Sequence, residues 1–307
     1  MTRHRESKRP PFGAFGGAEK GVAPPPLSPG LWLVSTPIGN ARDITLRAID
    51  VLEQADVLAC EDTRRTRKLM DIHAIPLRGR PMVAYNDQNG AARRPVILDH
   101  LNQGKSVAYA SDAGTPLIAD PGYQLVRSVR SAGHSVHVVP GPSSVPAALC
   151  LAGLPTDRFL FAGFLPAKQA ARRRALEALA KIDTTLVFFE SPRRLAECLA
   201  DMAETLGPER HAAILREITK LHEETKIASL GDLAEEISNR SAPKGEIVLV
   251  IEPPAPVPAA QGESLDAMIR AALADSTVKE ASQFVAQATG LSRREVYSRA
   301  LEIAAET

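Results

Sequence analysis

Along residues 31–140 the apolar positions form short runs that alternate with segments of helical period. The runs span four to six residues and are rich in Val, Leu and Ala, which is typical of buried strands. Strands separated by helices in this way indicate βαβ units and a mainly parallel sheet. The pattern predicts strands at residues 31–35, 56–61, 82–85, 106–110 and 134–139, with helices around 45–54, 63–71, 91–103 and 123–132.

The pattern changes beyond residue 153, where we place the boundary between two α/β domains, 30–152 and 153–252. A helix leads into this boundary, and Pro142 suits its first turn. In the second half two strand-like runs follow one another directly, so we expect a more antiparallel or mixed sheet. The predicted strands are residues 158–164, 184–190, 211–218, 222–229 and 245–252, with helices near 168–180, 192–206 and 230–238.

Both ends of the chain differ from this α/β pattern. Residues 1–29 are basic, rich in Gly and Pro and without the apolar stretch of a secretion signal, so we expect a disordered tail. Residues 253–264 form a Pro/Ala linker without periodicity. Beyond it, residues 265–307 predict a small helical module.

Within this module the sequence predicts a helix-turn-helix arrangement. Gly290 marks the end of one helix, and Ser292 is placed to cap the next one. The helical period then assigns the core face of the last helix to Val296, Ala300 and Leu301.

Composition narrows the class of protein. A chain of 307 residues with 44% hydrophobic and 24% charged residues, and without a membrane-spanning run, predicts a globular protein of the cytoplasm with no membrane partner. The net charge of +1 predicts no overall attraction to nucleic acid, so a polyanionic partner must be held by local basic patches. Cys60, Cys150 and Cys198 lie far apart in apolar patterns, and we interpret them as small buried residues.

The loop at residues 111–122 carries the clearest candidate chemistry. Asp112 follows a predicted strand, and ligands of open α/β sheets bind at the carboxyl ends of strands. Gly114 and Gly122 allow the backbone to approach a ligand, while two prolines stiffen the loop. A carboxylate here suits ribose hydroxyls or a cation, and the alternative is a structural turn with an Asx hydrogen bond.

Two further strand-end segments join this loop as candidates. They are STPIGNARDIT at residues 35–45 and GPSS at residues 141–144, and three such loops can line one crevice. The first has a single Gly, so the G-x-G-x-x-G dinucleotide pattern is absent. The sequence also lacks P-loop, HExxH and GxSxG patterns, and its seven histidines form no metal constellation, so we predict no metal site and neither a zinc nor a serine hydrolase.

Three charged segments each allow two interpretations. Residues 61–70 place two acids at a strand end and four bases on the next helix, which suits the helix dipole or a proton-transfer acid beside phosphate-binding cations. The basic run at 168–174 is either a solvated helix face or a phosphate-binding surface. At 215–224, strand alternation puts Glu217 and Thr219 on one face and the neighbouring bases on the other, although an exposed hairpin shows the same pattern.

The motifs resemble those of one family. In residues 31–252 the chain carries, in order, STPIGNARDIT, CEDTRRT, SDAGTPLIADPG, GPSS, GFLPAK, FESPRRL, REITKLHEE and KGEIVLV. These look like the motifs of the bacterial 16S rRNA cytidine 2'-O-ribose methyltransferases, a branch of the tetrapyrrole-methylase superfamily, and the helical tail resembles that family's helix-turn-helix module. The resemblance implies S-adenosylmethionine (AdoMet) bound between two α/β domains, usually in a homodimer. It implies as substrate a cytidine ribose in the decoding region of the small ribosomal subunit.

The resemblance also assigns roles to residues. Methyl transfer from a sulfonium needs mainly alignment, and a positioned carboxylate can take the proton of a ribose hydroxyl; our candidates for this carboxylate are Asp62 and Glu217. The residues expected at the cofactor are Pro37, Gly39, Asn40, Asp112, Gly114, Thr115, Pro142, Ser143, Phe164, Lys244, Gly245 and Glu246. Those expected to hold RNA phosphates are Arg64, Arg65, Lys168, Arg172, Arg173 and Lys220.

The chain departs from the family pattern at three places. Residues 85–90 read YNDQNG where the family commonly has a His-containing segment, so any role of those histidines does not carry over. Arg193 stands where a His is frequent. From Ser276 onward four basic residues balance four acidic ones, so the charge of the module does not itself indicate RNA binding.

Two other functions remain open at this point. One is a methyltransferase acting on a tetrapyrrole or another small molecule, although the first loop is TPIGN rather than the Gly-richer loop common in those enzymes. The other is a non-enzymatic nucleic-acid-binding protein that uses the helix-turn-helix unit. That function would leave about 220 residues of α/β core unexplained.

Overall fold

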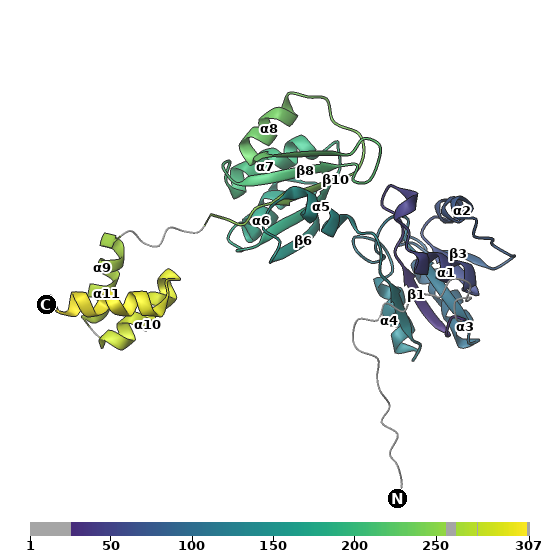
Figure 1. The fold of residues 1–307 in the computed structure, drawn as a ribbon, viewed down its shortest axis with the longest axis horizontal. Helices are drawn as coiled ribbons and strands as arrows, with labels where there is room; N and C mark the ends of the chain where they lie inside the picture. Colours follow the sequence, from purple (N-terminus) through teal and green to yellow (C-terminus); the bar gives the residue numbers. More distant parts are fainter. Residues whose placement is uncertain (1–25, 256–261, 275, 306–307) are drawn as a thin grey trace, which may run out of the picture.

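The computed structural model describes residues 26–255, 262–274 and 276–305. They form two α/β domains and a three-helix module (Figure 1). Most of the predicted tail lies outside the described residues. At its end, Leu27 packs against the first core and the Ser28 carbonyl accepts a 3.1 Å hydrogen bond from the indole of Trp32, so the packed chain begins before residue 30.

The first domain is built on a parallel sheet, as predicted. Its strands follow the order β3-β2-β4-β1-β5, and each of these pairings is parallel. Leu52 of α1 and Met70 of α2 pack on one face, while Ile97 of α3 and Leu125 of α4 pack on the other. The elements are β1 Gly30–Val34, α1 Leu46–Gln54, β2 Val57–Cys60, α2 Thr63–Ile72, β3 Met82–Ala84, α3 Gly90–Asn102, β4 Ser106–Ala110, α4 Tyr123–Ser131 and β5 Val136–Val139.

The second domain has a mixed sheet in the order β6-β7-β10-β8-β9. Strands β6 and β7 are parallel, whereas β10 runs antiparallel to β7 and β8. Strands β8 and β9 form the expected hairpin, with His211 opposite Ser229. Helices α6, α7 and α8 cover one face of the sheet. The elements are β6 Phe159–Phe164, α6 Gln169–Leu179, β7 Thr185–Glu190, α7 Leu195–Leu206, β8 His211–Arg216, β9 Glu224–Ser229, α8 Leu230–Ser238 and β10 Ile247–Ile251.

Helix α5, Ser144–Ala152, packs with the second domain and not with the first. Its Leu149 lies in one cluster with Val250 of β10, on the face that α6 to α8 leave free. The predicted boundary at residue 153 is therefore wrong, because by packing the second domain already begins before α5 (Figure 1). Pro142 also lies before the helix and not in its first turn.

The C-terminal module consists of α9 Gly262–Leu273, α10 Val278–Thr289 and α11 Arg293–Ala305. Helix α9 thus begins inside the stretch predicted as a linker. The predicted turn is confirmed: Gly290 ends α10 with a φ of +72°, and Ser292 Oγ accepts a 3.2 Å hydrogen bond from the Glu295 amide.

Two sequence predictions of burial need correction. Val296 and Ala300 are buried as expected, but Leu301 is 48% exposed and Ile303 takes the third core position, because its spacing of seven from Val296 returns it to the same helix face. Cys150 is exposed, whereas Cys60 is buried. In the described part of the chain no helix is both long and apolar enough to cross a membrane.

Candidate active site

The site is built where neighbouring parallel strands end. Strands β2, β4 and β1 are adjacent, so the loops after them meet at one edge of the sheet. Thr36 after β1 and Gly114 after β4 exchange two backbone hydrogen bonds, of 2.9 and 3.0 Å. The Thr36 hydroxyl also donates to the Ser111 carbonyl at 3.0 Å. The first and the fourth strand-end loops are therefore held together as one unit.

Asp112 fixes the loop after β2 to the same unit. Its amide donates to Glu61 Oε1 at 3.2 Å, and its Oδ1 accepts a 3.0 Å hydrogen bond from the Asp62 amide. Arg65 Nε lies 3.6 Å from Asp112 Oδ2. Asp112 thus links two loops instead of closing a turn of its own, and its side chain remains 24% exposed.

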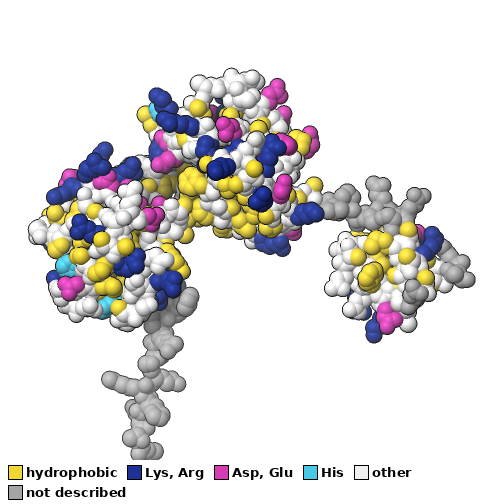
Figure 2. Space-filling model, turned by 180° about the vertical axis from the view of Figure 1, so that it is seen from behind, with side chains coloured by type: hydrophobic (Ala, Val, Ile, Leu, Met, Phe, Trp, Pro, Cys, Tyr) yellow, Lys and Arg dark blue, Asp and Glu magenta, His cyan; other side chains and the backbone are white. Residues whose placement is uncertain are grey.

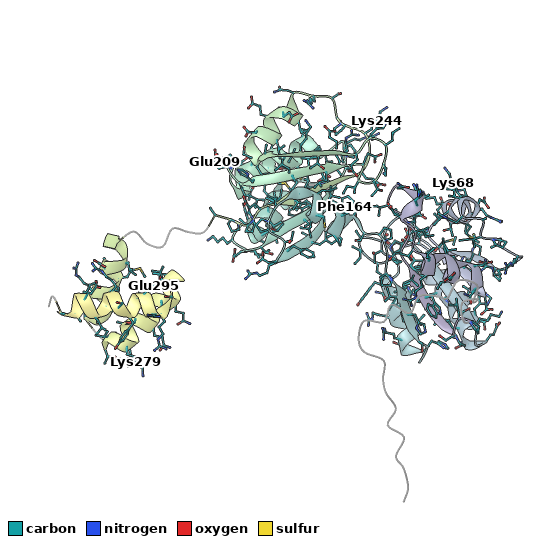
Figure 3. All side chains as sticks on the ribbon, in the orientation of Figure 1. Lys68, Phe164, Glu209, Lys244, Lys279 and Glu295 are labelled. Carbon is teal, nitrogen blue, oxygen red and sulfur yellow. The ribbon has the colours of Figure 1, made fainter. Side chains whose placement is uncertain are left out.

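A cleft of about 500 Å³ opens between these loops and the second domain. Figure 3 shows Phe164 on the side of the second domain that faces the first. Apolar walls with a few placed polar groups are typical of a small-molecule site of this size. The lining comprises Ile38, Glu61, Arg65, residues 112–115, residues 118–120, Ser143, Ser144, Phe164, residues 189–192 and residues 245–248.

The lining includes seven of the twelve residues predicted at the cofactor. Gly39 and Asn40 contact the second domain instead: the Asn40 amide donates to Thr219 Oγ1 at 3.1 Å, and a Cβ at Gly39 would lie 2.5 Å from Lys220 Cγ. Inside the cleft are Asp112, Gly114, Thr115, Ser143, Phe164, Gly245 and Glu246. Outside it are Pro37, Gly39, Asn40, Pro142 and Lys244.

Residues 217–223 form a turn and do not continue β8, so the strand alternation predicted there is wrong. Glu217 and Thr219 have positive φ angles of +53° and +66°. Lys220 Nζ lies 2.7 Å from Glu217 Oε1 and 3.0 Å from Glu246 Oε2. Glu217 and Lys220 were predicted on opposite faces of a strand, but their side chains form an ion pair.

This turn also needs a glycine beside it. Gly245 has a φ of +106°, and a Cβ there would lie 2.5 Å from the carboxyl carbon of Glu217. Glu217 Oε1 accepts a 2.9 Å hydrogen bond from the Glu246 amide. The hydrogen bond from Lys220 lowers the pKa of Glu217, so this carboxylate is poorly suited to take up a proton.

Asp62, the other predicted proton acceptor, is the N-cap of α2. Its Oδ1 accepts a 2.8 Å hydrogen bond from the Arg64 amide, and the Arg64 guanidinium binds both of its oxygens at 3.0 and 2.7 Å. These bonds hold the pKa of Asp62 far below its usual range. Asp62 does not line the cleft, so its geometry fits a helix cap and not a base.

Glu61 and Asp120 are the carboxylates that the sequence did not single out. Burial, followed by the charge of Asp120, raises the pKa of Glu61 to about 7. Burial, followed by the charges of Asp112 and Asp87, raises the pKa of Asp120 to about 6. The sequence did contain a signal that favours Glu61 over Asp62 as the residue of the site. Glu61 directly follows the fully buried strand β2, whereas the Asp-Thr-Arg sequence after it is typical of a helix start.

The basic run on α6 is partly structural. Arg172 is only 1% exposed and its Nε lies 2.6 Å from Asp201 Oδ2, so the prediction that it binds RNA phosphates is wrong. Arg173 also binds Asp201, at 2.7 Å, and pairs with Glu204. Lys168 precedes the helix and is exposed.

The other predicted phosphate contacts lie near the cleft. Arg64 and Arg65 on α2 are 89% and 65% exposed at their side chains, and Arg65 lines the cleft. Lys220 is held by two carboxylates in the turn after β8. Among the described residues no group of His, Cys, Asp and Glu is arranged to hold a metal ion.

Known families match both parts of the chain. The profile of the family Tetrapyrrole (Corrin/Porphyrin) Methylases matches residues 30–234. A second profile, the RsmI C-terminal HTH domain, matches residues 259–304.

Several relatives match most of the chain, and each is named ribosomal RNA small subunit methyltransferase I. The protein of Mesorhizobium japonicum is 47% identical over 91% of this chain and 93% of its own length. The protein of Erythrobacter litoralis is 48% identical over 91% and 96% of the two chains. That of Escherichia coli O157:H7 is 43% identical over 89% and 94%.

Solved structures share the fold at low sequence identity. The methyltransferase CobJ superimposes with a TM-score of 0.56 at 16% identity, over 74% of this chain and 95% of its own. The uroporphyrin-III C-methyl transferase of Thermus thermophilus, solved with S-adenosyl homocysteine, gives 0.51 at 21% identity, over 72% and 96% of the two chains. These likenesses confirm the predicted type of fold.

Proposed function

The chain belongs to the tetrapyrrole (corrin/porphyrin) methylase family, and from this premise we propose that it methylates the 2'-hydroxyl of a cytidine ribose in 16S rRNA, with AdoMet as the methyl donor. One observation carries the choice of substrate: relatives at 43–48% identity over about nine-tenths of the chain bear the name of a small-subunit rRNA methyltransferase. The motif resemblance adds the cytidine, its 2'-oxygen and the decoding region.

The described residues of the cleft fit AdoMet. Gly114 has a φ of +87° and a Cβ there would lie 3.3 Å from Ile38, so the backbone can border a ligand where a side chain would crowd it. Asp112 offers carboxylate oxygens to ribose hydroxyls, and Phe164 and Val248 offer apolar surface to a base. The acidic side chains of the lining complement a cation.

When bound, AdoMet supplies a methyl group that its sulfonium makes electrophilic. The chain must then align the acceptor and remove its proton. We assign the role of proton acceptor to Glu61, because this carboxylate lines the cleft and its pKa lies near neutral pH. Asp62 and Glu217 are instead paired with cations. The amide of Asp112 fixes Glu61 Oε1 and leaves Oε2 for the hydroxyl.

The exposed bases of α2 are our proposed contacts for the rRNA backbone. Arg65 lines the cleft, Arg64 is 89% exposed, and Lys68 lies on the same helix (Figure 3). The double reversal Arg64→Glu/Lys68→Glu is expected to weaken rRNA binding at least tenfold and to reduce its salt dependence, with AdoMet affinity unchanged. Lys279→Glu on the C-terminal module is the comparison variant. An equal loss with Lys279→Glu would assign the RNA contacts to the module instead.

The direct test supplies labelled AdoMet together with unmethylated 30S subunits, free 16S rRNA or uroporphyrinogen. We expect label in rRNA, recovered after nuclease digestion as 2'-O-methylcytidine. At saturating AdoMet, Glu61→Gln should reduce transfer at least a hundredfold, whereas Asp62→Asn should retain most activity because Asn also caps helices. Label in uroporphyrinogen alone would overturn the proposal.

We also propose that the chain forms a homodimer through the second domain. Its edge strand β6 carries Phe159, which is 48% exposed, and Leu151 of α5 is 38% exposed. Figure 2 shows apolar side chains gathered on one side of this domain. A large exposed apolar patch of this kind marks an interaction surface. Light scattering after size exclusion should give twice the mass of 32.9 kDa, and Leu151→Glu/Phe159→Glu should give the monomer.

A further inference from the structure

The described lining of the cleft is strongly acidic. It holds five carboxylates and one guanidinium, that of Arg65. The chain as a whole has a net charge of only +1, so this excess is local. The five acidic residues are Glu61, Asp112, Asp120, Glu190 and Glu246.

Three of the five carboxylates have a cation beside them. Asp112 lies 3.6 Å from Arg65 and Glu246 lies 3.0 Å from Lys220. The side chain of Glu190 is 1% exposed, its Oε2 has no hydrogen-bond partner among the described residues, and Arg194 approaches this oxygen to 3.4 Å. In the described chain no ion pair involves Glu61 or Asp120, so their charges are left for a ligand to balance.

We propose that the cleft selects the methyl donor by charge: Glu61, and Asp120 below neutral pH, are partly protonated in the free protein, and the sulfonium-bearing donor displaces the proton on binding. The O–H bond of a carboxyl group breaks, the proton passes to solvent, and the carboxylate then balances the sulfonium. The neutral thioether product lacks that charge and does not drive this release. This inference rests on the proposed function, because it takes AdoMet as the donor.

The surroundings of both carboxyls raise their pKa values in the free protein. The pKa of Glu61 lies near 7 and that of Asp120 near 6, raised by burial and then by neighbouring negative charge. The ionisable groups around them are Cys60, Asp62 and Arg65 from β2 and α2, Asp87 after β3, Tyr109 and Asp112 from β4 and its loop, and Glu246 from the second domain.

The direction of the coupling follows from these values. A nearby cation lowers a carboxyl pKa, so donor binding favours ionised Glu61 and becomes tighter as the pH rises through the range in which the free carboxyl loses its proton. A drop of one pKa unit or more from about 7 releases about 0.4 proton at pH 7 and makes binding roughly five- to tenfold tighter at pH 8 than at pH 6.

Calorimetry tests this coupling without any methyl transfer. AdoMet and S-adenosylhomocysteine are titrated into the full chain at pH 6, 7 and 8, in pairs of buffers that differ in heat of ionisation. We expect AdoMet to release about 0.4 proton at pH 7 and to bind five- to tenfold more tightly at pH 8 than at pH 6. The affinity for S-adenosylhomocysteine should change less than twofold over this pH range, and its binding should release few protons.

Variants separate Glu61 from other titrating groups. Glu61→Gln keeps an oxygen for the Asp112 amide and should abolish most of the proton release, while Glu209→Gln, on the far side of the second domain (Figure 3), should leave it intact. The amine of AdoMet titrates equally with the parent chain and with each variant, so its contribution to the proton release cancels when the variants are compared. Asp120→Asn is the second variant and should reduce the pH dependence below pH 7.

The outcomes are distinct. Equal pH dependence for donor and product, or proton release that persists in both Glu61→Gln and Asp120→Asn, would overturn the charge selection while AdoMet binding itself would support the proposed function. Failure of the parent chain to bind AdoMet at any of the three pH values would overturn the proposed function, and this inference with it.

Discussion

Replacing Glu61 by Gln should stabilise the first domain at pH 8 and do so far less at pH 5. The pKa of Glu61 is raised from its ordinary 4.5 to about 7 in the folded chain. Between these values the folded state binds more protons than the unfolded state, so the contribution of Glu61 to stability falls as the pH rises and stays unfavourable above pH 7. Gln carries no charge and removes this unfavourable contribution.

The size of the effect follows from the shift. A change of about 2.5 pKa units corresponds to about 3.4 kcal/mol, which is an upper bound. Glu61 is only partly buried, so solvent screening reduces the expected gain at pH 8 to about 1–2 kcal/mol. At pH 5 the linkage relation leaves about a quarter of that gain.

Urea unfolding monitored by tryptophan fluorescence measures this difference. The chain has one tryptophan, Trp32 of β1, which is 8% exposed and lies in the sheet whose strand β2 directly precedes Glu61. Asp62→Ala, one residue along, should instead lower stability by about 1 kcal/mol through loss of the α2 cap. Equal gains for Glu61→Gln at pH 5 and pH 8, or a loss at pH 8, would refute the assignment of a strained carboxyl to Glu61.

Three further substitutions test the site and its support. Asp112→Ala should weaken AdoMet binding about tenfold in calorimetry, and unchanged affinity would reduce the residue to a loop linker. Gly245→Ala, whose Cβ would clash at 2.5 Å, should lose at least tenfold in AdoMet affinity, while Gly207→Ala, with a similar φ of +108° but open space, should lose stability alone. Arg172→Met leaves Asp201 buried at 1% exposure with one cation fewer and should destabilise the second domain by about 3 kcal/mol in urea unfolding; a neutral result would mean that Arg173 suffices.

The sequence predicted the parallel sheet and the strand-end loops that line the cleft because both depend on local signals. Short buried runs, helical spacing and Gly/Pro loops determine strands, helices and strand ends without knowledge of distant contacts. Helix α5 could not be assigned to a domain in this way. It reads SVPAALCLA, which is apolar on every side, so its period does not reveal which sheet it covers.

Side-chain roles were harder to predict because partners lie far along the chain. Arg172 reads as one more base on an exposed helix, and its partner Asp201 is 29 residues away on α7. Glu61 and Asp62 are adjacent acids at one strand end, and which of them can act as a base depends on Asp112, about 50 residues later. The Asp112 amide donates to the carboxylate of Glu61, whereas the Asp112 carboxylate accepts from the amide of Asp62. Local pattern alone does not encode these contacts.

The edge of the first domain that we propose to bind the donor contains strained backbone. Leu117 and Ala119 adopt φ angles of +72° and +59°, a left-handed conformation that costs such residues about 1–2 kcal/mol each. Glu61 and Asp120 add mutual repulsion in the same wall. Burial alone would favour neutral residues here, so the acids fit the proposed binding of a positively charged donor that offsets the repulsion. The unfavourable charge of the free cleft is therefore the same property that would let it distinguish the cationic donor from its neutral product.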